Sequence, residues 1–459
     1  MKKDVERTWQ TAELKPDYEN MHKWDFYAAD IATEYIQSVE EGLDIEQYKD
    51  LFGAVARLPK GEIKKKLGDV LFQVVMSAPE REGYEYYEPS DIEEIRRVRR
   101  GASAPLPYDK DKLEERIHGA WLGRICGCML GKTVEGIRSN EMIPFLKETD
   151  NYPMHRYIYE SDLKAGTTEK YKFKFATSPY ADTIDGMPVD DDTNYVVLAQ
   201  ELVDKYGRDF TPSDMAKIWL SLQSKNAYCT AERVAYRNFV SGFNPPMSAT
   251  YQNPYREWIG AQIRGDYFGY INPGNPALAA EMAWRDASIS HVKNGIYGEM
   301  FVAAMLAIAA VSSDRMEIIL GGLAEIPETS RLYEAVMWVV NAYNSGLSKE
   351  QCLKEIGRRY DEYTDHGWCH TISNAMIVTA ALLYGEGDYG RSICMAVEAC
   401  YDTDCNGATV GSVLGMANGR ASIDAYWTDP IKDTLHTSIF GVGTVSISER
   451  ARHTLEHIV

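Results

Sequence analysis

Two short segments of the sequence carry closely spaced aspartates and lead into apolar stretches. Three consecutive aspartates stand at residues 190–192, and Asp402 and Asp404 flank a threonine further along the chain. Each segment lies where a helix is expected to begin, and the free backbone N–H groups at a helix start favour ionised carboxylates. Helix capping accounts for one aspartate in each segment. It leaves the neighbouring aspartates unexplained.

A divalent cation would explain the additional carboxylates. If the two segments meet in the fold, two carboxylates ~4 Å apart repel by ~4 kcal/mol at an effective dielectric of ~20. Protonation or a bound cation must offset that repulsion. Oxygen ligands at this density suit Mg²⁺ or Mn²⁺, which can orient a substrate diol and lower the pKa of a bound water. Either segment alone is more typical of a capped or solvated acidic turn than of a metal site, but two such segments in one helical domain favour a metal site.

Glycines recur every fourth residue in two places. The two series are Gly119, Gly123, Gly127 and Gly131, and Gly407, Gly411, Gly415 and Gly419. Each glycine inside a helix costs ~1 kcal/mol relative to alanine. A glycine stripe at this spacing lets another backbone approach closely. We therefore expect two buried helices that pack tightly, either against each other or against separate helices. Glu135 follows the first series by four residues and could transfer a proton beside the metals.

Helical periodicity dominates the chain. Apolar residues recur at three- and four-residue spacing in three early segments, at residues 24–41, 45–57 and 60–77. A stretch rich in Gly, Ala, Ser and Pro at residues 101–107 is the best linker candidate. We predict an all-α chain with a helical N-terminal module at residues 1–105 and a catalytic domain at residues 106–459. The only expected strand pairing is local, at residues 171–177.

Composition excludes several classes of partner. The net charge of −19 disfavours binding to nucleic acid or to an anionic membrane. No apolar stretch follows the N-terminus, which argues against a signal peptide. The most apolar run, residues 300–311, is shorter than the ~20 residues of a membrane span. The eight cysteines include no CxxC pair, so we expect free thiols and a cytoplasmic location.

Several of these motifs together resemble the ADP-ribosylglycohydrolase family, which includes dinitrogenase reductase-activating glycohydrolases. Residues 119–135 resemble the opening helix of that family, which ends in a catalytic glutamate. The family's two aspartate motifs match residues 190–193 and 402–407. Its glycine- and asparagine-rich substrate loop matches residues 269–276, and its histidine-containing helix matches residues 287–291. Their order and spacing match from about residue 113 to residue 420. The resemblance implies a compact multi-helix bundle.

The resemblance also implies an activity and a set of site residues. It implies a hydrolase that cleaves an N- or O-ribosyl bond of ADP-ribosyl type, with two Mg²⁺ or Mn²⁺ ions holding the ribose hydroxyls and the attacking water. Glu135 and Asp191 are the candidate catalytic residues. The candidate metal ligands are Asp190, Asp191, Asp192, Asp402, Asp404 and Cys405. The substrate would be a ribosyl or ADP-ribosyl small molecule or a modified protein, and the aglycone stays open.

Further residues are candidates for substrate binding. The candidates are Gly269, Tyr270, Asn272, Gly274, Asn275, His291 and His370. The loop at residues 272–275 could bind a phosphate or sugar through backbone N–H groups, or it could form a plain turn. His291 could bind substrate or satisfy a hydrogen bond in the core. His370 shares a helix face with Asn374 and could line the pocket or simply pack.

Two departures from the family pattern keep other interpretations open. Asp190 and Cys405 each stand where the family usually has threonine. Sulfur is a poor ligand for Mg²⁺, so Cys405 could leave the metal shell or the site could prefer Mn²⁺, and the substrate could differ. One alternative is a Mg²⁺-dependent all-α enzyme that acts on another ribosyl or diphosphate metabolite. The other is a non-catalytic relative that binds ADP-ribose or serves a structural role, although neither Glu135 nor the aspartates are lost.

Overall fold

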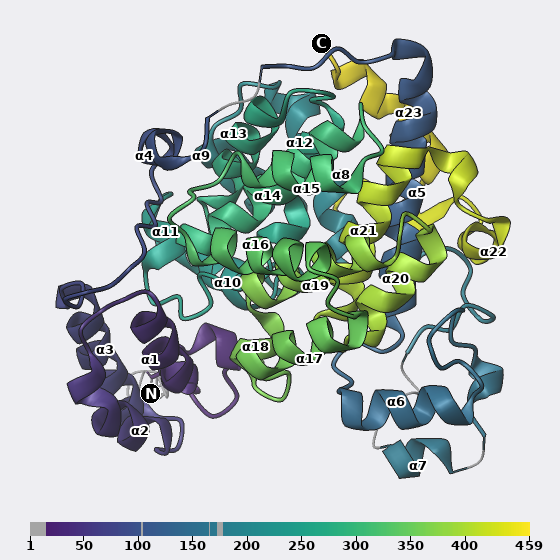
Figure 1. The fold of residues 1–459 in the computed structure, drawn as a ribbon. Helices are drawn as coiled ribbons and strands as arrows, with labels where there is room; N and C mark the ends of the chain where they lie inside the picture. The colour runs from purple at the N-terminus through teal and green to yellow at the C-terminus, as the bar shows by residue number, and fades with distance from the viewer. Residues whose placement is uncertain (1–14, 102–103, 165, 172–177) are drawn as a thin grey trace, which may run out of the picture. The chain divides into compact units, whose positions relative to one another are not determined.

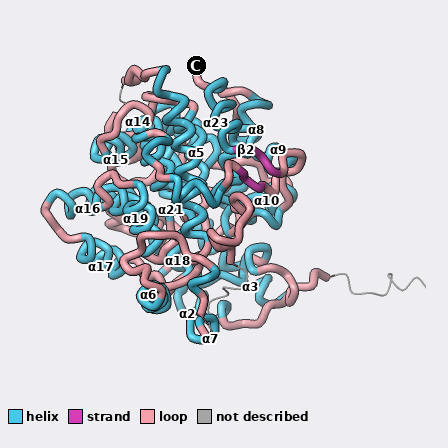
Figure 2. Tube along the Cα trace, turned by 90° about the vertical axis from the view of Figure 1, so that its right-hand side faces the viewer, coloured by secondary structure: helices cyan, strands magenta, loops and turns pink. Residues whose placement is uncertain are grey.

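The computed structural model describes residues 15–101, 104–164, 166–171 and 178–459. Almost all regular structure in these residues is helical, which confirms the predicted all-α class (Figure 1). The only strands in the described part form a short antiparallel hairpin of β1 (Thr434–His436) and β2 (Thr444–Ser446), magenta in Figure 2. Strand pairing was predicted at residues 171–177. Tyr171 ends helix α7 (Thr167–Tyr171), and residues 172–177 lie outside the described residues.

The chain divides into two compact units, residues 1–84 and residues 85–459. The α-helices of the first unit are α1 (Ile31–Glu40), α2 (Lys49–Ala56) and α3 (Glu62–Ser77). Each helix lies inside one of the three segments predicted from apolar periodicity. Short 3-10 turns precede α1 and α2, so these two helices begin later than the periodicity indicated. Ile31, Phe52 and Leu71, one from each helix, are buried in the core of this unit.

The second unit contains the remaining helices. They are α4 (Ile92–Val98), α5 (Lys110–Lys132), α6 (Ser139–Glu148), α7 (Thr167–Tyr171), α8 (Asp191–Tyr206), α9 (Pro212–Leu222), α10 (Thr230–Val240), α11 (Met247–Thr250), α12 (Asp266–Tyr270), α13 (Pro276–Ala287), α14 (Lys293–Ala309), α15 (Arg315–Leu323), α16 (Arg331–Asn344), α17 (Lys349–Arg359), α18 (Asp365–Cys369), α19 (Thr371–Tyr384), α20 (Tyr389–Glu398), α21 (Thr403–Asn418), α22 (Ala425–Thr428) and α23 (Ile447–Thr454). Helix α14 contains most of the apolar run at residues 300–311 and is buried from Asn294 to Ala309. A helix that is apolar on all sides needs this central position, and α12, α13, α15 and α16 pack around it.

The two glycine series pack against each other. Helices α5 and α21 lie side by side (Figure 1) and run antiparallel, so that Gly119 faces Gly415 and Gly127 faces Gly407. A Cβ atom placed on Gly123 would lie 2.1 Å from the carbonyl oxygen of Gly411. No side chain fits between backbones this close. The direct contact of the two stripes is therefore one of the two arrangements that the spacing predicted.

The glycine contact brings two helix ends together. At its far end, Gly131 packs on the backbone of Thr403, whose hydroxyl donates a 2.9 Å hydrogen bond to the Gly131 carbonyl oxygen. The last turn of α5 thereby lies against the first turn of α21. Helix α8 joins the same place because Arg124 of α5 donates a 2.9 Å hydrogen bond to the carbonyl oxygen of Asp192. Three helices far apart in sequence thus position one site.

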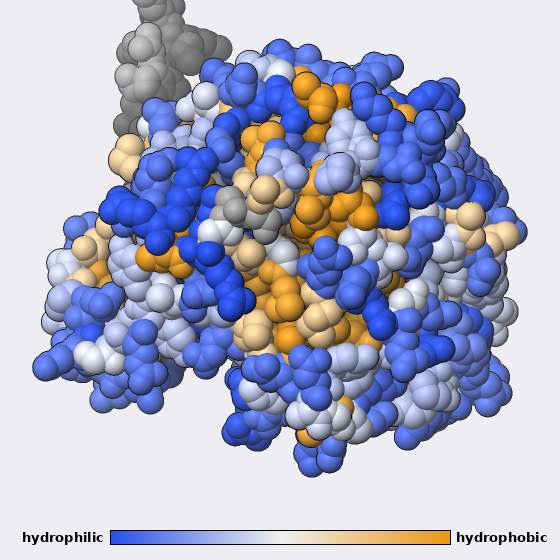
Figure 3. All heavy atoms as spheres, turned by 45° about the horizontal axis from the view of Figure 1, so that its top comes forward, coloured by the Kyte–Doolittle hydropathy of each residue, from blue (hydrophilic) through white to orange (hydrophobic). Residues whose placement is uncertain are grey.

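Three further features concern the apolar surface, the hydropathy of the helices and the state of the cysteines. On the face drawn in Figure 3, apolar side chains gather near the middle and hydrophilic side chains surround them. Across the described part of the chain, no helix combines the length and the apolar character that crossing a bilayer requires. All eight cysteines are free, as their spacing predicted.

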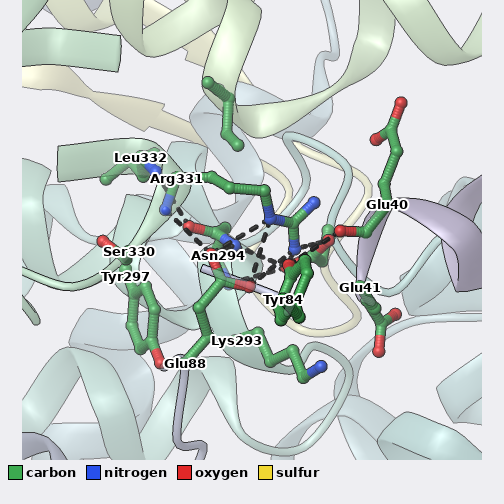
Figure 4. Close-up of polar contacts among 12 residues, drawn as sticks. Glu40, Glu41, Tyr84, Glu88, Lys293, Asn294, Tyr297, Ser330, Arg331 and Leu332 are labelled. Atoms are coloured by element: carbon green, nitrogen blue, oxygen red, sulfur yellow. Dashed lines mark hydrogen bonds and ion pairs between the residues drawn. The ribbon is translucent and has the colours of Figure 1, made fainter. Parts of the chain in front are cut away.

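Glu88 ties the segment before α4 to the core of the second unit. Its carboxylate pairs with Arg331 at 2.8 Å and accepts a 2.8 Å hydrogen bond from the Asn294 side chain (Figure 4). Glu88 also accepts a hydrogen bond from the backbone N–H of Arg331. Both Glu88 and Asn294 are buried. The predicted domain boundary at residues 105–106 stays a prediction, and this contact offers a way to test it.

We expect a chain that starts at residue 106 to unfold more easily than one that starts at residue 85. Only the longer chain keeps Glu88, and loss of one partner of a buried ion pair costs about 3 kcal/mol. Thermal unfolding of the two chains, followed by circular dichroism, measures the difference. Equal melting temperatures would show that residues 85–105 are dispensable, as a boundary at residue 105 requires.

Candidate metal centre

The two acidic segments meet in the structure. Asp190 caps the N-terminus of α8, Asp191 and Asp192 form its first turn, and Asp404 lies in the first turn of α21. One carboxylate oxygen from each of these four aspartates lies within 4.8 Å of the others. The sequence predicted this convergence of segments that are more than 200 residues apart, and it is confirmed for Asp404. Whether these aspartates bind metal stays a prediction.

Asp190 is already bonded at both carboxylate oxygens. Oδ1 accepts a 2.8 Å hydrogen bond from the backbone N–H of Asp192, which is the helix cap. Oδ2 lies 2.7 Å from the ammonium nitrogen of Lys132, the last residue of α5. Loss of hydration lowers the pKa of Lys132, but Asp190 and Asp404 raise it by more, so that the side chain is cationic. The carboxylate at this position is therefore paired with a lysine.

Asp192 and Asp404 present oxygens without a partner. Asp192 is fully buried, and its Oδ1 pairs with Arg124 at 2.9 Å, while Arg124 also pairs with Asp266. In the described part of the chain, Oδ2 of Asp192 and Oδ1 of Asp404 have no hydrogen-bond partner. A buried carboxylate oxygen without a partner costs free energy unless a cation or a proton reaches it. These two atoms are therefore the best-placed metal donors.

Asp402 and Cys405 flank this group. The Cys405 sulfur lies within 4.8 Å of carboxylate oxygens of Asp192 and Asp404, so its position permits it to be a ligand. Asp402 lies outside the groups of three or more such donors found among the described residues. The thiol of Cys369 donates a 3.8 Å hydrogen bond to the Asp402 carboxylate. The backbone N–H of Asp402 donates a hydrogen bond to the side-chain oxygen of Asn374.

Burial and mutual repulsion both raise the pKa values of the clustered carboxyl groups. Loss of hydration, together with the charges of Asp190 and Asp404, raises the pKa of Asp191 to about 8. Loss of hydration and Asp190 likewise raise the pKa of Asp404 to about 6. Lys132 and Arg124 offset only part of this charge. The donor set is rich in oxygen, has surplus negative charge and includes unpartnered atoms, so it fits a divalent cation.

Glu135 faces the same cluster. It follows α5 by three residues and is exposed to solvent, unlike Asp192 and Asp404. The charge of Asp404, followed by that of Asp190, raises the pKa of Glu135 well above its usual value. A carboxyl group that is accessible and holds its proton more tightly than usual suits proton transfer to a bound molecule.

The predicted substrate loop is bonded into the core. Gly269 and Tyr270 belong to α12, and the Tyr270 hydroxyl lies 2.6 Å from that of Ser412. The Asn272 amide donates to the carbonyl oxygen of Phe268. Gly274 has a positive φ of 70° and packs on the carbonyl oxygen of Leu106, and Asn275 caps α13 through its side chain. These contacts give each residue a structural function, and substrate binding by them stays a prediction.

The two candidate histidines are buried. His370 caps α19 by accepting a 3.1 Å hydrogen bond from the backbone N–H of Ile372. His291 contacts the Ser290 hydroxyl at 2.8 Å and lines a cavity of about 460 Å³ whose other walls include Pro246 and Trp284. None of the acidic cluster lines that cavity. A function of either histidine in substrate binding stays a prediction.

Sequence reasoning did not single out the two cations of the site. Arg124 and Lys132 are charged residues in the otherwise apolar second half of a glycine-striped helix. A charge that is buried on such a helix needs a partner of opposite sign, which was the available signal. Cys128, one turn before Lys132, was also missed, although its sulfur lies within 4.8 Å of Asp190 and Asp192 oxygens.

Comparison with known proteins extends the resemblance of the motifs to most of the chain. Residues 109–454 match the family model described as ADP-ribosylglycohydrolase. An uncharacterized protein of Archaeoglobus fulgidus is 24% identical over 327 residues, which cover 70% of this chain and 93% of that protein. A solved ADP-ribosylglycohydrolase-related protein complex is 18% identical with a TM-score of 0.47, covering 76% of this chain and 100% of that one. Because the family model matches well over half of its residues, the chain belongs to the ADP-ribosylglycohydrolase family.

Proposed function

We propose that this protein is a divalent-cation-dependent glycohydrolase that cleaves an N- or O-ribosyl bond of ADP-ribosyl type. The observation that carries the proposal is the convergence of Asp191, Asp192 and Asp404 beside the exposed Glu135. A structural acidic turn would leave these carboxylates solvated or paired. Instead, Asp192 and Asp404 are buried and keep oxygens without a partner in the described residues.

The donor set supports the metal requirement of this proposal. The proposal includes the two Mg²⁺ or Mn²⁺ ions that the family resemblance implies, with candidate ligands Asp190, Asp191, Asp192, Asp402, Asp404 and Cys405. Bound there, divalent cations would lower the pKa of a coordinated water and neutralise charge that develops as the glycosidic bond breaks. The ion pair with Arg124 holds the Asp192 carboxylate in one orientation, so that its free oxygen stays directed at the centre.

Glu135 is the proposed acid and base. Its carboxyl group can give a proton to the leaving group, or take one from the attacking water, without lying among the clustered aspartates. Asp191 is proposed to act beside it, and the pKa values of both carboxyl groups are raised above their usual values. The fields of the remaining carboxylates favour the oxocarbenium-like transition state expected for glycosidic cleavage.

The proposed substrate is a ribosyl or ADP-ribosyl small molecule or an ADP-ribosylated protein. A direct test offers arginine-linked and serine-linked ADP-ribosyl peptides and small ADP-ribosyl metabolites to the full-length chain, with Mg²⁺, Mn²⁺ or a chelator. Release of ADP-ribose or ribose measures turnover. We expect turnover with at least one of these substrates and none with the chelator.

Asp404→Asn should lower turnover in the same assay because it removes a charge from the metal centre. Excess Mn²⁺ should restore part of the lost activity, since the defect is in occupancy. The matched control is Asp388→Asn, which changes an aspartate that caps α20 and lies outside the cluster. Full activity of Asp404→Asn at limiting Mn²⁺, or unchanged turnover with the chelator, would contradict the proposal.

A further inference from the structure

We propose that the Lys132 ammonium group competes with a divalent cation for one of the two metal positions, so that the two cations bind with unequal affinity. The proposal rests on the metal-dependent function proposed above, and it assigns to this lysine the control of how fully the centre is loaded. Its basis is the ion pair between the Lys132 ammonium group and Asp190 Oδ2 at 2.7 Å.

Both carboxylate oxygens of Asp190 already have a partner while Lys132 stays in place. Oδ1 holds the backbone N–H of Asp192 as the cap of α8, and release of that bond would uncap the helix. Oδ2 is the only other oxygen, and the ammonium group occupies it. A cation that uses Asp190 Oδ2 as a ligand must therefore share this oxygen with the ammonium group or displace it. The positions that use Asp192 Oδ2 and Asp404 Oδ1 carry no such requirement, because these atoms have no partner in the described residues.

The two basic residues of the site differ in how easily they can move. Arg124 lies inside α5 with 1% of its side chain exposed, and it pairs with both Asp192 and Asp266. Lys132 is the last residue of α5, and 21% of its side chain is exposed. A lysine side chain is flexible and holds its partner as a point charge, whereas arginine makes a fixed, planar contact. Arg124 is thus a permanent part of the centre, and Lys132 is the cation that can swing out.

Repulsion adds to this direct competition. An ammonium group within a few ångström of a divalent cation opposes its binding strongly, since the site has little water to screen the charges. Binding of the second cation therefore carries a free-energy cost that binding of the first does not. The two metal positions would therefore fill over two separate ranges of divalent-cation concentration.

The test measures Mn²⁺ binding, without turnover, by calorimetric titration and native mass spectrometry of the full-length chain. We expect two unequal steps in the natural protein. Lys132→Met should tighten the second step by ~10-fold or more, because the competing charge is gone. Lys132→Arg keeps the charge and should leave the steps unequal. Lys112→Met is the matched control, since Lys112 lies on the same helix and pairs with Asp109 away from the centre.

An Asp190→Asn background separates competition from general charge repulsion. If Lys132 competes for the Asp190 carboxylate, Asp190→Asn should abolish the second step, and adding Lys132→Met should then change the first step little. Melting temperatures of all variants check that they fold. Equal steps in the natural protein, or a second step unaffected by Lys132→Met, would overturn the inference and leave the metal centre standing. Failure of every variant and of the natural protein to bind Mn²⁺ would overturn the proposed function itself.

Discussion

Glu135→Gln is expected to lower turnover by ~10²–10⁴-fold, the usual contribution of general acid–base catalysis. The amide has nearly the shape of the carboxyl group but cannot transfer the proton. Because Glu135 is not one of the clustered donors, the variant should bind Mn²⁺ with unchanged affinity and show the same metal-dependent rise in melting temperature. Turnover against Mn²⁺ concentration, with melting curves in parallel, measures both effects.

The comparison with a metal-ligand variant makes this prediction sharp. Excess Mn²⁺ should partly rescue Asp404→Asn and should never rescue Glu135→Gln. Glu141→Gln, in the first turn of the next helix, is the matched control and should keep full turnover. Complete rescue of Glu135→Gln by metal would identify Glu135 as a ligand and remove it from proton transfer.

Gly123→Ala should destabilise the protein by about 3 kcal/mol, the upper end for overpacking a tight contact. The new methyl group would lie 2.1 Å from the carbonyl oxygen of Gly411, and neither backbone can yield without separating α5 from α21. Because the same contact sets Asp404 beside Glu135, the variant should also bind Mn²⁺ more weakly. Urea unfolding followed by circular dichroism measures the first effect, and calorimetry measures the second.

Gly357→Ala is the matched control for this substitution. Gly357 lies in α17, it is exposed, and the nearest atom to a new Cβ would be the Tyr401 hydroxyl at an ordinary 3.8 Å. Alanine has the higher helix propensity, so this variant should be more stable by up to about 1 kcal/mol. Equal effects at Gly123 and Gly357 would mean that the glycine stripes do not hold the two helices together.

The framework of the site was readable from the sequence because it depends on regular spacing. Glycines at every fourth residue have few explanations other than close helix packing, and they predicted α5 and α21 as contact helices. Clustered aspartates at helix starts predicted where the acidic groups would meet. The sequence left open which helices face each other, since the same stripe could serve two separate contacts.

The partners of single side chains could not be predicted in this way. Whether Asp190 faces a metal or Lys132 depends on how α5 is rotated against α8, and one sequence does not fix that angle. The loop at residues 269–276 has the composition of a ligand-binding turn, yet the side chains of Asn272 and Asn275 form hydrogen bonds with nearby backbone groups. Such bonds compete with ligand binding and depend on the surrounding helices.

A crystal soaked with Mn²⁺ and ADP-ribose tests the central claim most directly. We expect anomalous density for Mn²⁺ within about 2.0–2.6 Å of carboxylate oxygens of Asp192 and Asp404, the range for hard cations and oxygen ligands. The ribose should lie between the metal and Glu135. Anomalous density elsewhere, or ADP-ribose bound away from Glu135 with the aspartates still unliganded, would contradict the assignment of this cluster as the catalytic centre.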